Sequence, residues 1–331
     1  KELTVTKSGI NTWVITDAKK LDKIVYLVND TFDIEKSSIS LIPLSPSGTN
    51  IEPKNYVLNL HGLIGYFDSL KEARYELSIT SPINFKRTST LRSVNEKFSD
   101  DGEEVTSKYI ASRYFDITDN PMMYGDLDIE NFKVGKVNFE LSVYSSNKLH
   151  TAKKIKNSLL QMLEAQVAYI GDINSTQNYT IMVYFSDGKD KSPHGYGGLE
   201  HNTSTVIVMP DYWEEKKLYN IMFDMMANEF FHIVTHMNIH SEDIHDFDYN
   251  NPTFSKHLWL YEGVTEYFSK LFKVDQKLIT KDEFYISLLD KIKDAKNYDD
   301  DISFTFMSEN ILDEKYKVNY PNVYRKGALI A

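Results

Sequence analysis

The spacing of apolar residues changes along this 331-residue chain, and the change falls near Thr151. Before it, apolar residues form short β-branched or aromatic runs separated by Pro, Gly and Ser, which is typical of strands joined by turns. After it, they recur every three or four positions, which is the period of an amphipathic helix. We therefore predict a β-rich N-terminal domain at residues 1–148 and a second domain, containing helices, at residues 149–331.

Six runs in the first part are predicted to be strands of an antiparallel, sandwich-like domain. They are residues 24–28, 38–42, 56–60, 75–79, 109–115 and 137–144. The turn residues between them include Ser45-Pro46-Ser47-Gly48 and Ser81-Pro82. None of these runs carries a group of residues typical of catalysis, so we expect this domain to support or flank a site that lies elsewhere.

The composition excludes several classes of function. Hydrophobic residues make up 41% of the chain and aromatic residues 13%, which indicates a folded protein. A net charge of −11, spread along the chain, argues against binding to nucleic acid or to an anionic membrane. The absence of Cys excludes disulfides, cysteine nucleophiles and thiolate zinc sites. No run approaches the length of about 18 apolar residues that a membrane span needs.

The second part opens with a predicted helix at residues 151–169 and a buried strand at 179–185. A glycine-rich segment at residues 195–198 then precedes a strand of β-branched residues. A phosphate-binding glycine loop would open a helix instead, so nucleotide binding is not favoured. Glycines beside an edge strand allow another backbone to approach, as in an extended peptide that adds to the sheet. Glu200 would then project toward one end of that peptide.

A long apolar-periodic run from about Lys216 to Met237 predicts the central helix of the second domain. It contains Asn228, Glu229 and His232. In the helical pattern H-E-x-x-H, two His residues bind zinc and the Glu between them activates water. This chain has the Glu and the second His, and Asn228 stands at the position of the first. Taken alone, x-E-x-x-H is a weak signal because it occurs by chance in many helices.

A further candidate ligand lies in the next predicted helix. An apolar-periodic run begins after Pro252 and includes Glu262 within residues 257–268. A charged group inside such a helix needs a partner, because an unpaired buried charge is strongly unfavourable. Glu262 is therefore the candidate that would complete a metal site with His232.

Several segments of the chain resemble the glycyl aminopeptidase family of zinc metallopeptidases, which is related to the thermolysin-like and aminopeptidase N enzymes. In order, they are residues 119–125, 197–201, 229–232, 247–249, 258–267 and 324–327. The resemblance covers nearly the whole chain. It implies an α+β fold of two domains, with an N-terminal β domain followed by a thermolysin-like, or gluzincin, zinc-peptidase domain. It also implies further sequence after Ala331 and a location outside the cytoplasm, periplasmic or secreted.

The resemblance implies a role for individual residues of the reaction. His232 and Glu262 would bind Zn²⁺, with Asn228 in place of the usual His ligand. Glu229 would act as general base, taking a proton from the metal-bound water and passing it to the leaving amine. Tyr324 would donate a hydrogen bond to the oxyanion that forms during the reaction.

Substrate recognition is implied in the same way. Glu200, in one strand with Gly197 and Gly198, would bind the free amino terminus of a peptide and so restrict cleavage to its first residue. Glu266, one helical turn after Glu262, would orient a metal ligand. The expected partners are therefore peptides with a free amino terminus.

Asn228 leaves two functions open. A neutral carboxamide is a poor zinc ligand beside imidazole, so we expect metal affinity to fall steeply. His236, one turn beyond His232, could pair with it on an ion, but Ile233 would then occupy the position of the base; His240 is expected at the surface. The chain is either a zinc aminopeptidase with weak or altered metal binding, or a catalytically silent relative that binds peptides in the same groove.

Overall fold

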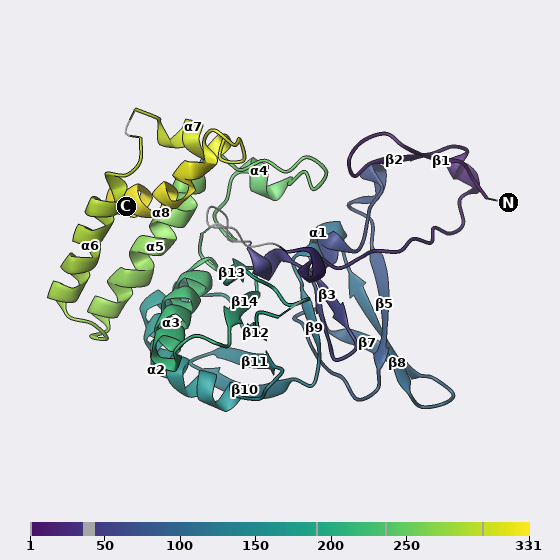
Figure 1. Cartoon of the computed structure of the whole chain (residues 1–331), viewed down its shortest axis with the longest axis horizontal. Helices are drawn as coiled ribbons and strands as arrows, with labels where there is room; N and C mark the ends of the chain where they lie inside the picture. The colour runs from purple at the N-terminus through teal and green to yellow at the C-terminus, as the bar shows by residue number, and fades with distance from the viewer. Residues whose placement is uncertain (1, 36–43, 190, 236, 300) are drawn as a thin grey trace.

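A computed structural model describes residues 2–35, 44–189, 191–235, 237–299 and 301–331 of the chain. It has a β-rich N-terminal part and a second part in which helices cover a mixed sheet (Figure 1). The predicted α+β fold, with an antiparallel β domain before a helix-containing domain, is confirmed. Short 3-10 helices connect the elements at Ala18–Lys20, Phe32–Ile34, Ser45–Ser47, Leu60–Gly62, Asp68–Leu70, Gly171–Ile173 and Lys317–Asn319.

Two antiparallel sheets form the body of the N-terminal part. The four-stranded sheet has the order β3, β4, β9, β6, and the three-stranded sheet has the order β5, β8, β7. Their strands are β3 (Asn50–Glu52), β4 (Asn55–Leu58), β5 (Tyr75–Pro82), β6 (Lys86–Thr88), β7 (Ser93–Phe98), β8 (Glu104–Ala111) and β9 (Met122–Gly125). The hydroxyl groups of the buried residues Tyr109 and Tyr124 lie 2.9 Å apart and join β8 to β9. The helix α1 (Tyr114–Thr118) connects these two strands.

Some of the predicted strands differ from the observed ones. The run at 56–60 is β4, which ends at Leu58, and the run at 109–115 ends as a strand at Ala111 because α1 begins at Tyr114. The strand predicted at 24–28 is wrong, since these residues form no regular element and Leu27 is fully exposed. β-branched residues form a strand only where a neighbouring strand can pair with them. The strand predicted at 38–42 lies outside the described residues.

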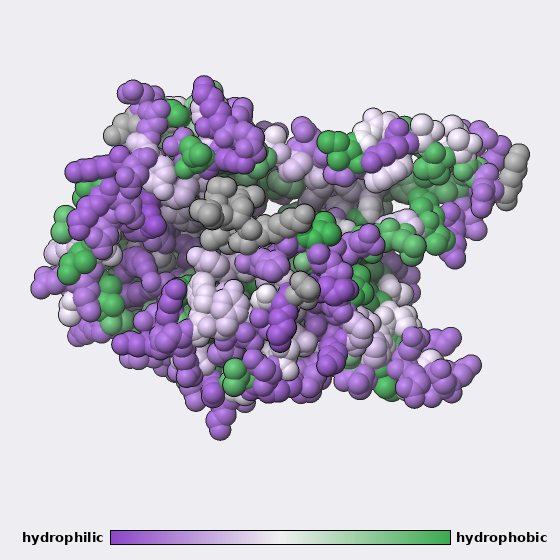
Figure 2. All heavy atoms as spheres, in the orientation of Figure 1, coloured by the Kyte–Doolittle hydropathy of each residue, from purple (hydrophilic) through white to green (hydrophobic). Residues whose placement is uncertain are grey.

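An arm at the N-terminus stands apart from the body. It consists of β1 (Val5–Lys7) and β2 (Trp13–Ile15), which pair only with each other in the part of the chain that the structure describes. Hydrophobic surface is visible along this arm in Figure 2, and its exposed side chains include Val5, Trp13 and Val14.

A five-stranded mixed sheet is the centre of the second part. Its order is β10 (Asp128–Val134), β11 (Val137–Ser145), β12 (Asn178–Ser186), β14 (Ser204–Pro210) and β13 (Gly197–Glu200). β12 is parallel to both its neighbours and is almost completely buried, as expected for a central strand covered on both faces. β13 is an edge strand. The sheet spans the boundary predicted at residue 148, because β10 and β11 precede it.

Helices cover one face of this sheet, and the N-terminal part covers the other. On the first face, α2 (Ala152–Ile170) and α3 (Glu215–Phe231) pack against the sheet. On the second, Phe32, Val57 and Met123 of the N-terminal part pack against Tyr184 and Val208 of the sheet. The remaining helices are α4 (Glu242–His245), α5 (Leu258–Asp275), α6 (Lys281–Ala295), α7 (Phe304–Glu309) and α8 (Tyr320–Ile330).

The ends of two helices bear on the predictions. The helix α2 agrees with the prediction at 151–169, with the side chain of Thr151 accepting from the N–H of Lys154 at its start. The helix predicted to extend to Met237 is shorter, since α3 ends at Phe231. In the part of the chain that the structure describes, no helix is long and apolar enough to cross a membrane.

Candidate active site

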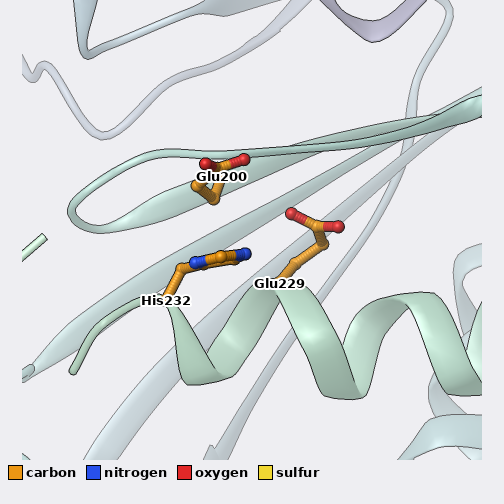
Figure 3. Close-up of side chains that lie close together, drawn as sticks. All are labelled: Glu200, Glu229 and His232. Atoms are coloured by element: carbon orange, nitrogen blue, oxygen red, sulfur yellow. The ribbon is translucent and has the colours of Figure 1, made fainter. Parts of the chain in front are cut away.

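Three of the predicted site residues meet where the end of α3 faces the edge strand β13 (Figure 3). Glu200 is the last residue of β13, Glu229 lies in the last turn of α3, and His232 follows that helix directly. One ligand atom from each of the three lies within 4.8 Å of the others. The end of the helix and the edge of the sheet thus bring together two carboxylates and one imidazole.

The turn that ends α3 orients His232. The backbone N–H of His232 lies 3.2 Å from the carbonyl oxygen of Glu229, which closes the helix. The ring Nδ1 lies 2.9 Å from the carbonyl oxygen of Thr235. Because a carbonyl only accepts, Nδ1 carries a proton in this contact, and Nε2 is the ring nitrogen that faces Glu262 and could bind a metal.

Glu262 joins the group from α5. Its Oε2 lies 3.7 Å from Nε2 of His232, and the two residues are 6% and 2% exposed. Burial raises the pKa of Glu262 to about 7, although His232 and a hydrogen bond from Tyr324 act in the opposite direction. The predicted ligands His232 and Glu262 therefore lie side by side in a buried position.

Glu229 is close enough to both other carboxylates for their charges to affect it. Burial, and then the charges of Glu200 and Glu262, raise the pKa of Glu229 well above its usual value. Its Oε2 is buried and has no hydrogen-bond partner among the described residues. Three neighbouring carboxylates with a buried oxygen lacking a partner require protons or a cation, so these residues fit a divalent metal ion.

Gly198 provides the space that Glu229 occupies. A Cβ atom at Gly198 would lie 2.4 Å from Oε1 of Glu229 and 2.5 Å from its Cδ. The carboxyl group of Glu229 can therefore lie against β13 only because residue 198 has no side chain. We predicted that Gly197 and Gly198 leave room for a peptide backbone; the structure adds a contact within the chain for Gly198.

A close crossing of α5 and α8 brings Tyr324 to the site. A Cβ atom at Gly263 would lie 2.4 Å from the backbone carbon of Gly327, so the two helices touch backbone to backbone. Gly263 follows Glu262, and Gly327 lies one turn after Tyr324. Our sequence reasoning missed this pair, although a Gly inside an apolar-periodic helix indicates a packing reason for its presence.

Tyr324 connects to a second tyrosine that the sequence analysis did not identify. The hydroxyl oxygens of Tyr320 and Tyr324 lie 3.2 Å apart. Either hydroxyl can donate in this contact, and a hydrogen bond from Tyr324 also lowers the pKa of Glu262. Burial and the charge of Glu262 raise the pKa of Tyr324 well above its usual value, which keeps this phenol protonated and able to donate.

Two other predicted residues lie near the group. Asn228 is a half-buried residue of α3, one turn before His232. Glu266 forms an ion pair with Lys291 of α6, and the side chains are 17% and 6% exposed. This pair links α5 to α6, and the negative charge of Glu266 contributes to the raised pKa of Glu262. The role of Glu266 in orienting a ligand stays a prediction.

The alternative, in which His232 and His236 bind one ion, assumed that both residues lie one turn apart in the same helix. The helix α3 ends at Phe231, before His232, so this assumption does not hold. His236 itself lies outside the described residues. Thr235, in the turn that follows α3, contacts α5 through hydroxyl groups of Thr235 and Thr265 that lie 3.2 Å apart. His240 is exposed, and its Nε2 lies 3.3 Å from Nδ1 of His245.

Comparison with protein families finds two matches along the chain. Residues 1–126 match the Peptidase M61 N-terminal domain, and residues 222–330 match the M61 glycyl aminopeptidase domain. The second match includes Glu229, His232, Glu262 and Tyr324. No curated protein sequence matches the chain.

The solved structures with a similar fold include the following two. An aminopeptidase N family protein from Idiomarina loihiensis is 21% identical with a TM-score of 0.70, and the match covers 85% of this chain and 49% of that chain. An M1 zinc metallopeptidase from Deinococcus radiodurans is 13% identical with a TM-score of 0.52, covering 87% and 61%. The chain thus spans about half the length of the first relative. At these identities the likeness establishes a shared fold.

Proposed function

The chain belongs to the M61 glycyl aminopeptidase family, and from this premise we propose that it is a zinc-dependent aminopeptidase with a weakened metal site. Its substrates are peptides with a free amino terminus. One observation carries the proposal: the donors of Glu200, Glu229 and His232 converge within 4.8 Å beside the buried carboxylate of Glu262.

The metal would be held by Nε2 of His232 and the carboxylate of Glu262, with Asn228 at the third position. When bound, Zn²⁺ supplies a Lewis acid and lowers the pKa of a bound water. A cation among these carboxylates also favours their charged forms, and so offsets the burial that raises the pKa of Glu229 and Glu262.

Glu229 and Tyr324 are the groups suited to the chemical step. In its charged form the Glu229 carboxylate can take a proton from water and give it to the leaving amine. The hydroxyl of Tyr324 stays protonated because burial raises its pKa, so it can donate to the oxygen of the reacting carbonyl. A donor of this kind typically contributes about 10²–10³ in rate.

The edge strand supports recognition of the peptide. The strand β13 pairs with β14 and lies at the edge of the sheet, so an extended peptide can add beside it through main-chain hydrogen bonds. Glu200, at the end of β13, can pair with the ammonium group of the first residue. A peptide blocked at its amino terminus would not offer this carboxylate an ammonium group.

A second candidate function follows from Asn228. With a carboxamide at a ligand position, the same groove can bind peptides without hydrolysing them. Measurement of zinc content together with hydrolysis of Gly- and Ala-anilides separates the two. Bound zinc with turnover supports the aminopeptidase. Peptide binding without zinc or turnover supports the silent relative, and the lack of both zinc and peptide binding contradicts both proposals.

A further inference from the structure

Asp119, a residue of the N-terminal part, contacts the turn that directly follows Glu200. It ends α1, and its side chain is only 11% exposed. Its Oδ1 accepts from the backbone N–H of Asn202 at 3.2 Å, and its Oδ2 accepts from the side-chain amide of Asn202 at 2.8 Å. Nδ1 of the buried residue His201 lies 3.5 Å from Oδ1. One carboxylate thus holds both residues that follow Glu200.

These contacts fix the end of the strand that carries Glu200. On one side, Glu200 is paired with Thr205 of β14. On the other, the turn is closed by the N–H of His201, which lies 2.9 Å from the carbonyl oxygen of Ser204, and is tied to Asp119. A carboxylate that recognises an ammonium group must be held in position, since a misplacement of about 1 Å can cost about 10²-fold in function.

The helix α1 also contacts the chain between His232 and α5. The hydroxyl of Thr118 lies 3.1 Å from that of Tyr249, and the rings of Tyr114 and Tyr249 form an edge contact with centroids 5.1 Å apart. Tyr249 belongs to the chain between His232 and α5. The N-terminal part therefore touches both the strand of Glu200 and the segment that follows His232.

From this geometry we propose that Asp119 is a positioning residue for Glu200, through which the N-terminal part sets the recognition of a peptide's amino group. The inference rests on the proposed function. Asp119→Asn tests it, because both carboxylate oxygens accept hydrogen bonds from Asn202. In the variant one of these oxygens becomes an NH₂ group, which would face an N–H donor of Asn202. Asp116→Asn is the matched control, since Asp116 lies in α1 and contacts Ser112 and Arg113.

The measurement is binding of a fluorescent Gly-peptide whose second residue is a D-amino acid, which blocks cleavage, in free and N-acetylated forms. We expect the parent to bind the free form more tightly than the N-acetylated form. In Asp119→Asn the ratio of these two affinities should fall at least about tenfold. Zinc content should stay at the parent value, and Asp116→Asn should keep the parent's preference. A folded Asp119→Asn protein with the parent's preference overturns the inference alone. A parent without any preference overturns the proposed function as well.

A milder variant keeps the test informative if Asp119→Asn does not fold. Asn202→Ala removes the side-chain amide that lies 2.8 Å from Asp119 and leaves the backbone bond in place. We expect it to lose part of the preference, and an unchanged preference overturns the inference. The double variant Asp119→Asn with Asn202→Asp exchanges the acceptor and the donor of the side-chain hydrogen bond. We expect its preference for the free peptide to be stronger than that of Asp119→Asn alone.

Discussion

Nε2 of His232 lies 3.7 Å from Oε2 of Glu262, and both side chains are buried. This separation is too long for a strong hydrogen bond, but it is close to the spacing of about 3.4 Å between two ligand atoms of a tetrahedral zinc ion. The residues come from the end of α3 and the start of α5, so the packing of these helices builds the pair. We expect metal affinity to depend on Asn228, one turn before His232.

Asn228→His should tighten zinc binding. The outer partners of metal ligands already contribute about 10–100-fold to affinity, so a direct imidazole ligand should contribute at least as much. The measurement is competition with a chelator of known affinity. Asn228→Ala is the control and should bind no more tightly than the parent. Equal affinities for the parent and the His variant would show that residue 228 does not face the ion.

Gly198→Ala should lower hydrolysis of an Ala-anilide by about 10²-fold, because the added methyl group displaces the carboxyl of Glu229. Zinc content should change little, since His232 and Glu262 are not moved. Gly65→Ala is a suitable control, as a Cβ atom there meets nothing within 4 Å. Full activity of Gly198→Ala would contradict the contact between Gly198 and Glu229.

Gly327→Ala should destabilise the fold at the crossing of α5 and α8. A Cβ atom there would lie 2.5 Å from the carbonyl oxygen of Trp259, and overpacking of this kind typically costs about 1–3 kcal/mol. Urea unfolding measures the change in the free energy of unfolding, again with Gly65→Ala as control. A stability equal to that of the parent would mean that the helices do not cross in backbone contact.

The metal-free protein should lose stability as the pH rises. The pKa of Glu262 is raised from 4.5 to about 7 in the folded protein, chiefly by burial. Between these pH values the folded state binds more protons than the unfolded state, so the free energy of unfolding falls with increasing pH. The contribution is of the order of 3 kcal/mol, at about 1.4 kcal/mol per pKa unit.

Urea unfolding from pH 4.5 to 8, with the protein kept metal-free by a chelator, measures this dependence. Glu262→Gln should be less dependent on pH than the parent, because the amide does not titrate. Part of the slope should remain, since burial and neighbouring charges also raise the pKa of Glu229. Identical slopes for the two proteins would exclude a raised pKa at Glu262.

Local patterns in the sequence were sufficient for several elements. The apolar run at 179–185 predicted β12, and the helical period after Thr151 predicted α2, because a side-chain period of two or 3.6 reflects the face that an element buries. The apolar period around Asn228, Glu229 and His232 also predicted a helix there, although α3 ends at Phe231, directly before His232. These features depend on neighbours in sequence, and the order of the quoted segments was enough to indicate the family.

Other features depended on partners far along the chain. The run at 24–28 has strand-forming residues but no strand beside it, and α3 ends at Phe231 although apolar residues continue. The close contact of Gly263 with Gly327, the place of Tyr320 beside Tyr324 and the hold of Asp119 on the turn after Glu200 could not be read from spacing. Periodicity specifies which face of an element is buried, whereas only tertiary packing decides which residues meet there.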